Sequence, residues 1–299
     1  MTDRVEGLLA RLAAGAAIGD GDGALLASTT DILTLGMLAD EARRRRHGAD
    51  TTYLRVADVS LPLAGGLLHI PPAAREVRVR ADAAEVASLL PALRDVAAAA
   101  GGVPVSAFSL ADLQAHARAS GTPLVDLLRE IRHAGVTSIA EAPIDVLDEA
   151  EPALEAVRLA GLGLARLTVQ RQADAEARVA LIKRAVELQH ALGWLASFAP
   201  LPRSWSAAAP TTGYEDVRQV ALARLLADNI PSIQVDWSLY GPKLAQVALT
   251  VGADDLDAVP AVDDESEGRR RATLEEVRRN IRAAALVPVE RDGIYGRIG

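Results

Sequence analysis

Two carboxylates stand where side chains could do acid–base chemistry. Glu141 and Asp236 each come near the end of a segment that reads as a strand. In a fold of parallel strands, the strand ends that carry chemistry lie together at one edge, so we expect both carboxylates to face one cavity. They could act there as general acid and base. Asp236 could equally form a structural ion pair with Arg171 or Arg203.

Other polar or aromatic side chains, at predicted strand ends or beyond Gly241, could bind a ligand. The candidates are Ser106, Arg171, Ser197, Trp237, Lys243, Asp254, Asp255 and Arg291. For those beyond Gly241 the alternative role is structural, because they could fasten the last helix to the floor or rim of the fold. Asp254, Asp255 and Asp257 offer too few ligands to hold a cation, so we predict no metal site.

The elements that must position these residues alternate along the chain. Amphipathic or Ala/Leu-rich helices, such as residues 31–47, separate short strands such as Glu76–Arg80, in which Val77 and Val79 face one way. This alternation predicts an α/β fold, a TIM-like β/α barrel of six to eight strands that could be incomplete. We assign residues 1–30 to an N-terminal helix and loop. Residues 31–299 would form a single barrel domain with a C-terminal helix and tail.

Two stretches predict loops. Gly19–Gly23 has the composition of a turn and lacks the ligand series of a calcium loop. Gly252–Arg271, which is acidic and then basic, would connect the helix that starts near Pro242 to a last helix at residues 273–285. The side chains of the Pro242 helix that we expect to be buried are Leu244, Val247 and Leu249.

Composition excludes several classes of function. The formal net charge of −8 leaves no basic stripe to neutralise phosphates, so we expect no nucleic-acid partner. No apolar run is long enough to span a bilayer and the N-terminus does not read as a signal peptide, which predicts a cytoplasmic protein without a membrane partner. The chain contains no cysteine. Thiolate chemistry is therefore excluded.

The C-terminal third of the chain carries a family resemblance. Trp237-x3-Gly241-x-Lys243-Leu-Ala-Gln, then Gly252-Ala-Asp-Asp-Leu-Asp257, then Val287-Pro-Val-Glu-Arg-Asp-Gly-Ile-Tyr295 resembles the radical-SAM enzymes of the futalosine route to menaquinone. Among these enzymes, the motifs most resemble those of aminofutalosine synthase. Dehypoxanthine futalosine cyclase and the F420-cofactor synthase subunits are also similar. The resemblance implies a barrel of the radical-SAM type.

Three elements of the family's chemistry are missing from this sequence. The resemblance implies a Cys-x3-Cys-x2-Cys motif for a 4Fe–4S cluster, but Ser60–Pro72 stands in its place. A glycine run that lets the backbone approach SAM is replaced by Ala140–Pro143, and a Tyr-Gly-His-like segment by Gln170–Gln172. We therefore expect no cofactor, neither the cluster nor SAM.

Two classes of function remain open. The first is a catalytically degenerate relative of aminofutalosine synthase that acts as a partner or regulator in menaquinone biosynthesis. The alternative is a cluster-independent enzyme of lyase or isomerase type, or a binding protein, for a nucleoside-like or aromatic acid ligand. A filled barrel top would favour the partner, and an open pocket with convergent polar groups would favour the alternative. In either case the chain could form a homo-oligomer.

Overall fold

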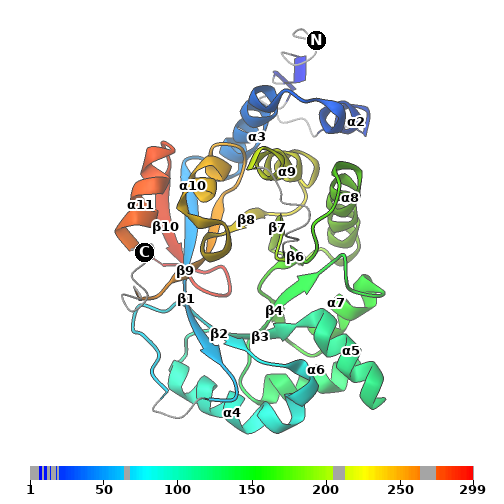
Figure 1. The fold of residues 1–299 in the computed structure, drawn as a ribbon, viewed down its shortest axis with the longest axis vertical. Helices are drawn as coiled ribbons and strands as arrows, with labels where there is room; N and C mark the ends of the chain where they lie inside the picture. The colour runs from blue at the N-terminus through cyan, green and yellow to red at the C-terminus, as the bar shows by residue number, and fades with distance from the viewer. Residues whose placement is uncertain are drawn as a thin grey trace.

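The computed structural model describes Gly7, Leu8, Ala10, Arg11, Ala14 and Ile18, and then residues 20–63, 68–204, 213–262 and 274–298. In the described residues the chain alternates between strands and helices (Figure 1). None of the helices in this part of the chain combines the length and the apolar character that a bilayer crossing requires.

Eight parallel strands of the described residues close into a barrel. In barrel order they are β1 (Asp50–Ser60), β2 (Glu76–Arg80), β3 (Val105–Ser109), β4 (Ser138–Pro143), β6 (Leu167–Val169), β7 (Ser197–Pro202), β8 (Ser232–Asp236) and β9 (Asp255–Pro260). The ring is complete because β9 pairs back to β1, through residue pairs such as Thr52 with Asp255. This confirms the predicted β/α barrel, at the upper end of the six to eight strands.

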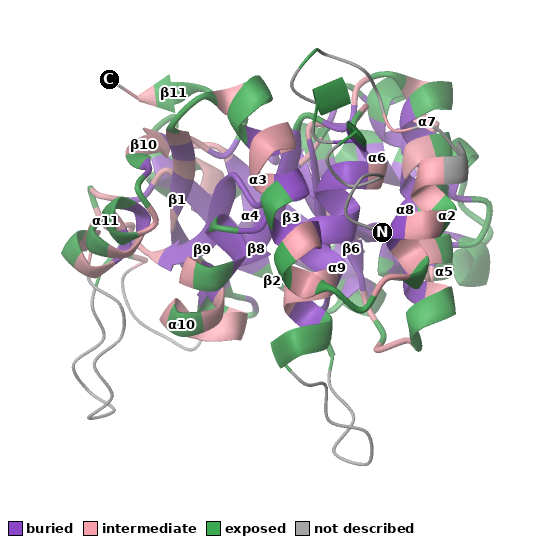
Figure 2. Ribbon diagram, turned by 90° about the horizontal axis from the view of Figure 1, so that it is seen from above, coloured by how far each residue is buried: buried purple, intermediate pink, exposed green. Residues whose placement is uncertain are grey.

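Helices surround the barrel, with buried faces toward the strands and exposed faces outward (Figure 2). They are α3 (Ile32–His47), α4 (Val86–Ala100) after the short 3-10 helix η1 (Ala83–Glu85), α5 (Leu110–Ser120), α6 (Leu124–His133), α7 (Ala150–Leu159), α8 (Ala175–Leu192), α9 (Gly213–Leu226), α10 (Trp237–Leu249) and α11 (Leu274–Ala283). The connection from β1 to β2 differs, because its described residues, 61–63 and 68–75, lie in no helix.

Two predicted loops are corrected by the structure. The stretch from Gly19 was expected to turn, but helix α2 (Asp20–Ser28) begins at its second residue. A Cβ at Gly23 would lie 3.2 Å from the Leu226 side chain of α9, so the glycine permits close packing of the two helices and tertiary contact overrides turn composition. The stretch from Gly252 was also expected to be a loop, but it contains β9. Its aspartates point into a charged barrel interior.

Two further strands, β10 (Val287–Arg291) and β11 (Arg297–Ile298), follow the barrel and lie at the amino ends of its strands. Strand β10 pairs in parallel with the first half of β1, and β11 pairs antiparallel with β10. The two-residue strand β5 (Gly163–Leu164) extends the pairing of β4 in a similar way. A Cβ at Gly293 would lie 3.1 Å from Pro104 and 3.2 Å from Glu76, so the tail passes close beneath β2 and β3.

Helix α10 consists of two helical pieces that meet at Gly241, whose φ of 74° and ψ of 170° are not helical. Its expected burial is partly wrong. Leu249 is fully buried and Leu244 is half-buried, but Val247 is 45% exposed. The residues that face the barrel are Ala245, Ala248 and Leu249, which have the spacing of one face of a regular helix, so small alanines and not Leu244 and Val247 form the buried stripe.

Candidate functional site

A ring of four alternating charges fills the middle of the barrel. Arg78 of β2 lies 2.9 Å from Glu76 and 2.8 Å from Asp257 of β9. Arg166, which stands directly before β6, completes the ring at 3.1 Å from Glu76 and 3.0 Å from Asp257. Ser106 donates a hydrogen bond of 2.7 Å to Glu76 from β3. The four charged side chains are almost completely buried.

The ring keeps its two acids ionised. Burial alone would raise the pKa of Asp257, but Arg166 and Arg78 outweigh it and hold that pKa well below its ordinary value. Glu76 follows the same rule: burial raises its pKa, Arg78 and Arg166 lower it, and the net shift is downward. The arginines therefore face carboxylates, not carboxylic acids, at neutral pH.

A second layer lies below the ring, at the amino ends of the strands. Arg291 of β10 binds both oxygens of Asp255, at 2.6 and 2.7 Å, and Asp255 also accepts from Thr52 and Gln234. The Arg291 guanidinium lies 4.3 Å from the centre of the Tyr295 ring.

The Tyr295 hydroxyl closes this layer from below. It shares a hydrogen bond with Ser197 and donates one of 2.5 Å to the Ala165 carbonyl. Burial raises the pKa of Tyr295 to about 12, so its hydroxyl stays protonated.

The third layer lies at the carboxyl ends of the strands, where Arg203 joins the two predicted acids. Its Nε lies 2.7 Å from Glu141, and one terminal nitrogen lies 3.2 Å from Asp236. Asp236 also caps α10 through hydrogen bonds from Ser238 and the Leu239 N–H. The two carboxylates therefore converge as predicted, and of the two arginines considered as partners for Asp236, it is Arg203 that pairs with it.

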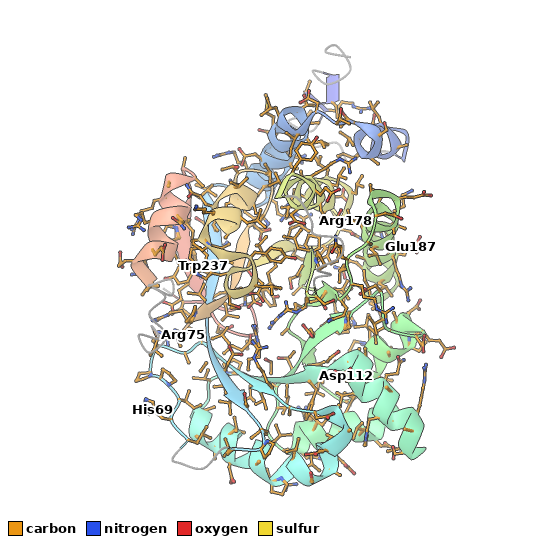
Figure 3. All side chains as sticks on the ribbon, viewed as in Figure 1. His69, Arg75, Asp112, Arg178, Glu187 and Trp237 are labelled. Atoms are coloured by element: carbon orange, nitrogen blue, oxygen red, sulfur yellow. The ribbon has the colours of Figure 1, made fainter. Side chains whose placement is uncertain are left out.

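A cavity of about 370 Å³ opens beside this third layer. Its lining residues are Arg78, Val79, Arg80, Ala81, Phe108, Ser109, Asp112, Ala140, Glu141, Arg166, Gln170, Arg203, Asp236, Ser238 and Leu239. Figure 3 labels Asp112, an exposed residue of α5 that lines the cavity. Burial, Glu141 and Asp82 raise the pKa of Asp112. The barrel top is thus open and polar, not filled.

The predicted ligand-binding residues are distributed over several places, and none of them lines this cavity. Ser106 belongs to the charged ring, while Ser197, Asp255 and Arg291 belong to the layer below it. Asp254 is also buried, at the amino end of β9, where it accepts from Arg224 and the Ile233 N–H.

The other three predicted residues lie outside these layers. Trp237 is buried at the start of α10, and Arg171 and Lys243 are exposed. Instead of pairing with Asp236, Arg171 donates its backbone N–H to Asp145. That any of the eight predicted residues binds a ligand stays a prediction.

Glu76, Arg78, Phe108, Asp112 and Arg166 belong to the site but were not among the residues predicted from the sequence. A signal for the first two was present, because Glu76 and Arg78 alternate with Val77 and Val79 in a strand of a fold whose sheet is covered on its outer face. The charged face had to point into the barrel. For Phe108, nothing in the sequence indicated its φ of 60°, a left-handed conformation in a non-glycine residue.

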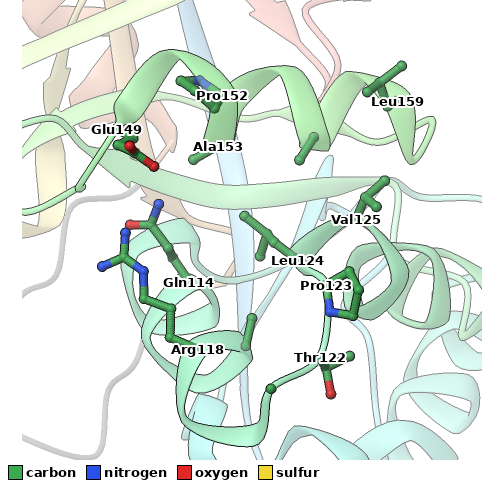
Figure 4. A pocket seen from close by; sticks show the side chains of 13 residues that line it. Gln114, Arg118, Thr122, Pro123, Leu124, Val125, Glu149, Pro152, Ala153 and Leu159 are labelled. Carbon is green, nitrogen blue, oxygen red and sulfur yellow. The ribbon is translucent and has the colours of Figure 1, made fainter.

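A second hollow lies on the outside of the barrel, between α5, α6 and α7 (Figure 4). It measures about 610 Å³, and its wall is mainly apolar, with Leu124, Val125 and Leu159 among its residues. Gln114, Arg118 and Glu149 gather at one end. Leu159 is 61% exposed, so this groove presents apolar surface to the outside.

The residues present do not fit an iron–sulfur cluster. The whole chain lacks cysteine, so no thiolate can bind iron. Among the described residues, no group of three or more histidine and carboxylate side chains could hold a metal ion. Four arginines line the cavity, Arg78, Arg80, Arg166 and Arg203, against the three acids Asp112, Glu141 and Asp236, so the lining does not favour a cation.

The closed ring of eight parallel strands, with helices around it, defines a TIM-like β/α barrel. The solved structure of methylornithine synthase (PylB) has the same fold, with a TM-score of 0.67 at 12% identity over 94% of this chain and 97% of that one. At this identity the likeness concerns the fold alone.

Several known proteins are similar to this chain in sequence. Residues 199–297 match the family model described as the CofH/MqnC C-terminal region. Aminodeoxyfutalosine synthase of Thermus thermophilus is 26% identical over 93% of this chain and 91% of its own length. 5-Amino-6-(D-ribitylamino)uracil–L-tyrosine 4-hydroxyphenyl transferase of Archaeoglobus fulgidus is 28% identical over 70% of this chain and 68% of its own length. The chain contains no cysteine and is similar in sequence to these enzymes, over 93% of its length for the first, which confirms the resemblance.

Proposed function

We propose that this chain is a radical-SAM-like barrel that works without an iron–sulfur cluster and binds a small molecule in the cavity at the carboxyl ends of its strands. The observation that carries the proposal is the cavity itself. Its volume lies within the range typical of ligand pockets, and charged groups converge on it from β2, β4 and β8 and from Arg166 before β6. The relatives support a ligand of nucleoside-like or aromatic acid type, since their names refer to futalosine and tyrosine.

Binding is favoured over lyase or isomerase catalysis by the contacts of the two candidate acids. Glu141 and Asp236 are both held by Arg203, and Asp236 additionally caps a helix. Carboxylates fixed in this way are poorly placed to exchange protons with a substrate. Any residual catalysis would therefore fall to Asp112, which lines the cavity and has a raised pKa.

A titration with nucleosides and small aromatic acids tests the proposal. We expect at least one compound to bind by calorimetry and to raise the melting temperature. The cavity-filling variant Ala140→Leu should abolish this binding because Ala140 lines the cavity and a larger side chain takes up its space. A matched variant in the outer groove, Leu159→Ala, should bind as the wild type does. Binding that survives Ala140→Leu would place the ligand elsewhere.

A second candidate function is that of a partner or regulator in menaquinone biosynthesis. The apolar outer groove between α5 and α7 favours it, because exposed apolar surface often marks a protein contact. The test is co-purification with the menaquinone-pathway enzymes of the same organism. A partner bound there should be lost from Leu159→Glu and retained by Ala140→Leu; equal recovery with both variants would count against this candidate.

A further inference from the structure

We propose that the floor of the barrel cavity is a carboxylate subsite, in which the anionic group of a small monocarboxylic acid lies on the guanidinium groups of Arg78 and Arg166. The inference rests on the proposed small-molecule function and names the class of ligand and the residues that select it.

Two buried guanidinium groups in the cavity lining, those of Arg78 and Arg166, carry the inference. The NH1 nitrogen of Arg78 and the Nε nitrogen of Arg166 are buried without a hydrogen-bond partner, and so are Oε2 of Glu76 and Oδ2 of Asp257 in the same ring. The side chains of Arg78 and Arg166 are 5% and 2% exposed, yet both residues line the cavity. A guanidinium group can only donate, so the surface that Arg78 and Arg166 present to the cavity is complemented by an acceptor.

The side of the charged ring that meets the cavity is cationic. Arg78 and Arg166 are part of the cavity lining, whereas their carboxylate partners Glu76 and Asp257 are not. A ligand therefore contacts the positive members of a ring that is neutral as a whole. A carboxylate fits this surface better than a neutral acceptor, because charge-assisted hydrogen bonds to guanidinium groups are shorter and stronger.

Single charge and an apolar body complete the description of the ligand. Glu141, Asp236 and Asp112 also line the cavity, so a dianion such as phosphate would meet more repulsion than a monoanion. Val79, Phe108 and Leu239 supply an apolar wall. Phe108 holds a left-handed φ of 60°, and strain of this kind is concentrated at functional sites.

Calorimetry with benzoate, benzamide and inorganic phosphate tests the ligand class on the full chain. Benzoate and benzamide have nearly the same shape and differ in charge. We expect benzoate to bind about tenfold or more tightly than benzamide, in keeping with a charge-assisted contact. Phosphate should bind more weakly than benzoate. If benzamide binds as well as benzoate, the carboxylate subsite is refuted while the proposed function stands. If neither binds and no other small molecule does, both fail.

A charge-balanced double variant tests the residues. Glu76→Gln with Arg78→Gln removes one cation and one anion, so the rest of the ring stays neutral. It should weaken benzoate binding about tenfold and leave benzamide binding unchanged. Arg129→Gln, an exposed arginine on α6, should behave as the wild type. Unchanged benzoate affinity in the folded double variant would overturn the assignment.

A measurement on the wild type covers the case in which the double variant does not fold. NMR of ¹⁵N-arginine-labelled protein follows the Nε–H signal of Arg166, and benzoate should shift it in proportion to the bound fraction. A bound benzoate that leaves this signal unmoved would also overturn the assignment.

Discussion

Arg291 and Asp255 form a bidentate ion pair at the base of the barrel, with nitrogen–oxygen distances of 2.6 and 2.7 Å and both side chains at most 2% exposed. Asp255 belongs to the closed barrel, whereas Arg291 lies in the added strand β10. The pair therefore fastens the last part of the chain to the barrel wall.

Substitution of Arg291 should be strongly destabilising. Arg291→Met leaves Asp255 buried without its cation, and we expect a loss of about 3–5 kcal/mol in the free energy of unfolding. Urea denaturation at neutral pH measures this loss. Arg297→Met is the matched control in the same tail, since its pair with Asp50 is exposed and should be worth about 0–1 kcal/mol. Equal losses would show that burial of the pair is not what matters.

The charged ring makes stability depend on acid. The folded pKa of Asp257 lies far below its unfolded value of about 3.9. Its ionised form therefore stabilises the fold fully above that value, and the contribution is lost as the pH falls toward the folded pKa.

We expect Asp257→Asn to cost about 3–5 kcal/mol at pH 7 and to show a flatter loss of stability between about pH 4 and 2. Denaturation curves across this range check both. The exposed Asp58→Asn should change neither.

The raised pKa of Asp112 predicts a contribution to stability with the opposite pH dependence. Its pKa is raised, so the neutral acid suits the folded state better than the carboxylate. Its contribution is favourable below the unfolded pKa and is lost as the pH rises through the folded pKa. Asp112→Asn should therefore stabilise the protein slightly at pH 7, and the gain should vanish at about pH 3. Thermal melts at the two pH values check this, with the exposed Asp126→Asn as control. A loss of stability at pH 7 would contradict the assignment.

Iron should not bind in stoichiometric amount after anaerobic reconstitution with iron and sulfide. The chain offers no thiolate, and the described side chains offer no alternative ligand cluster. Iron analysis and the visible absorbance of the desalted protein measure this, beside a cysteine-containing radical-SAM enzyme treated in parallel. A cluster absorbance band would disprove the expectation.

Packing of α10 should be uneven along the helix. Leu249 is completely buried, so Leu249→Ala should cost about 2–5 kcal/mol. Val247 is 45% exposed, and Val247→Ala should stay within about 0.5 kcal/mol of the wild type. Chemical denaturation of the two variants provides the comparison. A large loss at Val247 would indicate that this face is covered in solution.

The barrel could be predicted from the sequence because the apolar spacing of its helices and the alternation of its strands are both local patterns. The helix over residues 31–47 and the strand Glu76–Arg80 were predicted within a residue of their observed bounds. Strand β9 was missed for the opposite reason. Asp255 and Asp257 read as solvated loop residues, and only pairing with Arg291, Arg78 and Arg166 makes their burial possible.

The site was predictable where it depends on strand ends and unpredictable where it depends on distant pairing. Glu141 and Asp236 were placed at one edge from the strand pattern alone, and the two arginines named as partners for Asp236 included the correct one, Arg203, beside Arg171, which does not pair with it. The ring that forms the cavity floor joins Arg78 to Asp257, 179 residues apart. Such a contact leaves no local trace in a single sequence.

Strand β1 has a consequence for how the protein is made. Its partners β9 and β10 come more than 200 residues later, through pairs such as Thr52 with Asp255 and Asp50 with Val287. During synthesis both edges of the first half of β1 must stay unpaired until residues 255–291 have left the ribosome, because Thr52 and Tyr53 pair with β9 on one edge and with β10 on the other. This exposes a template for aggregation. Barrel closure therefore waits until residues 255–260 have been made, and slow refolding is expected from the long-range pairing. Ribosome-bound chains that end before residue 255 should be far more sensitive to protease than the released protein.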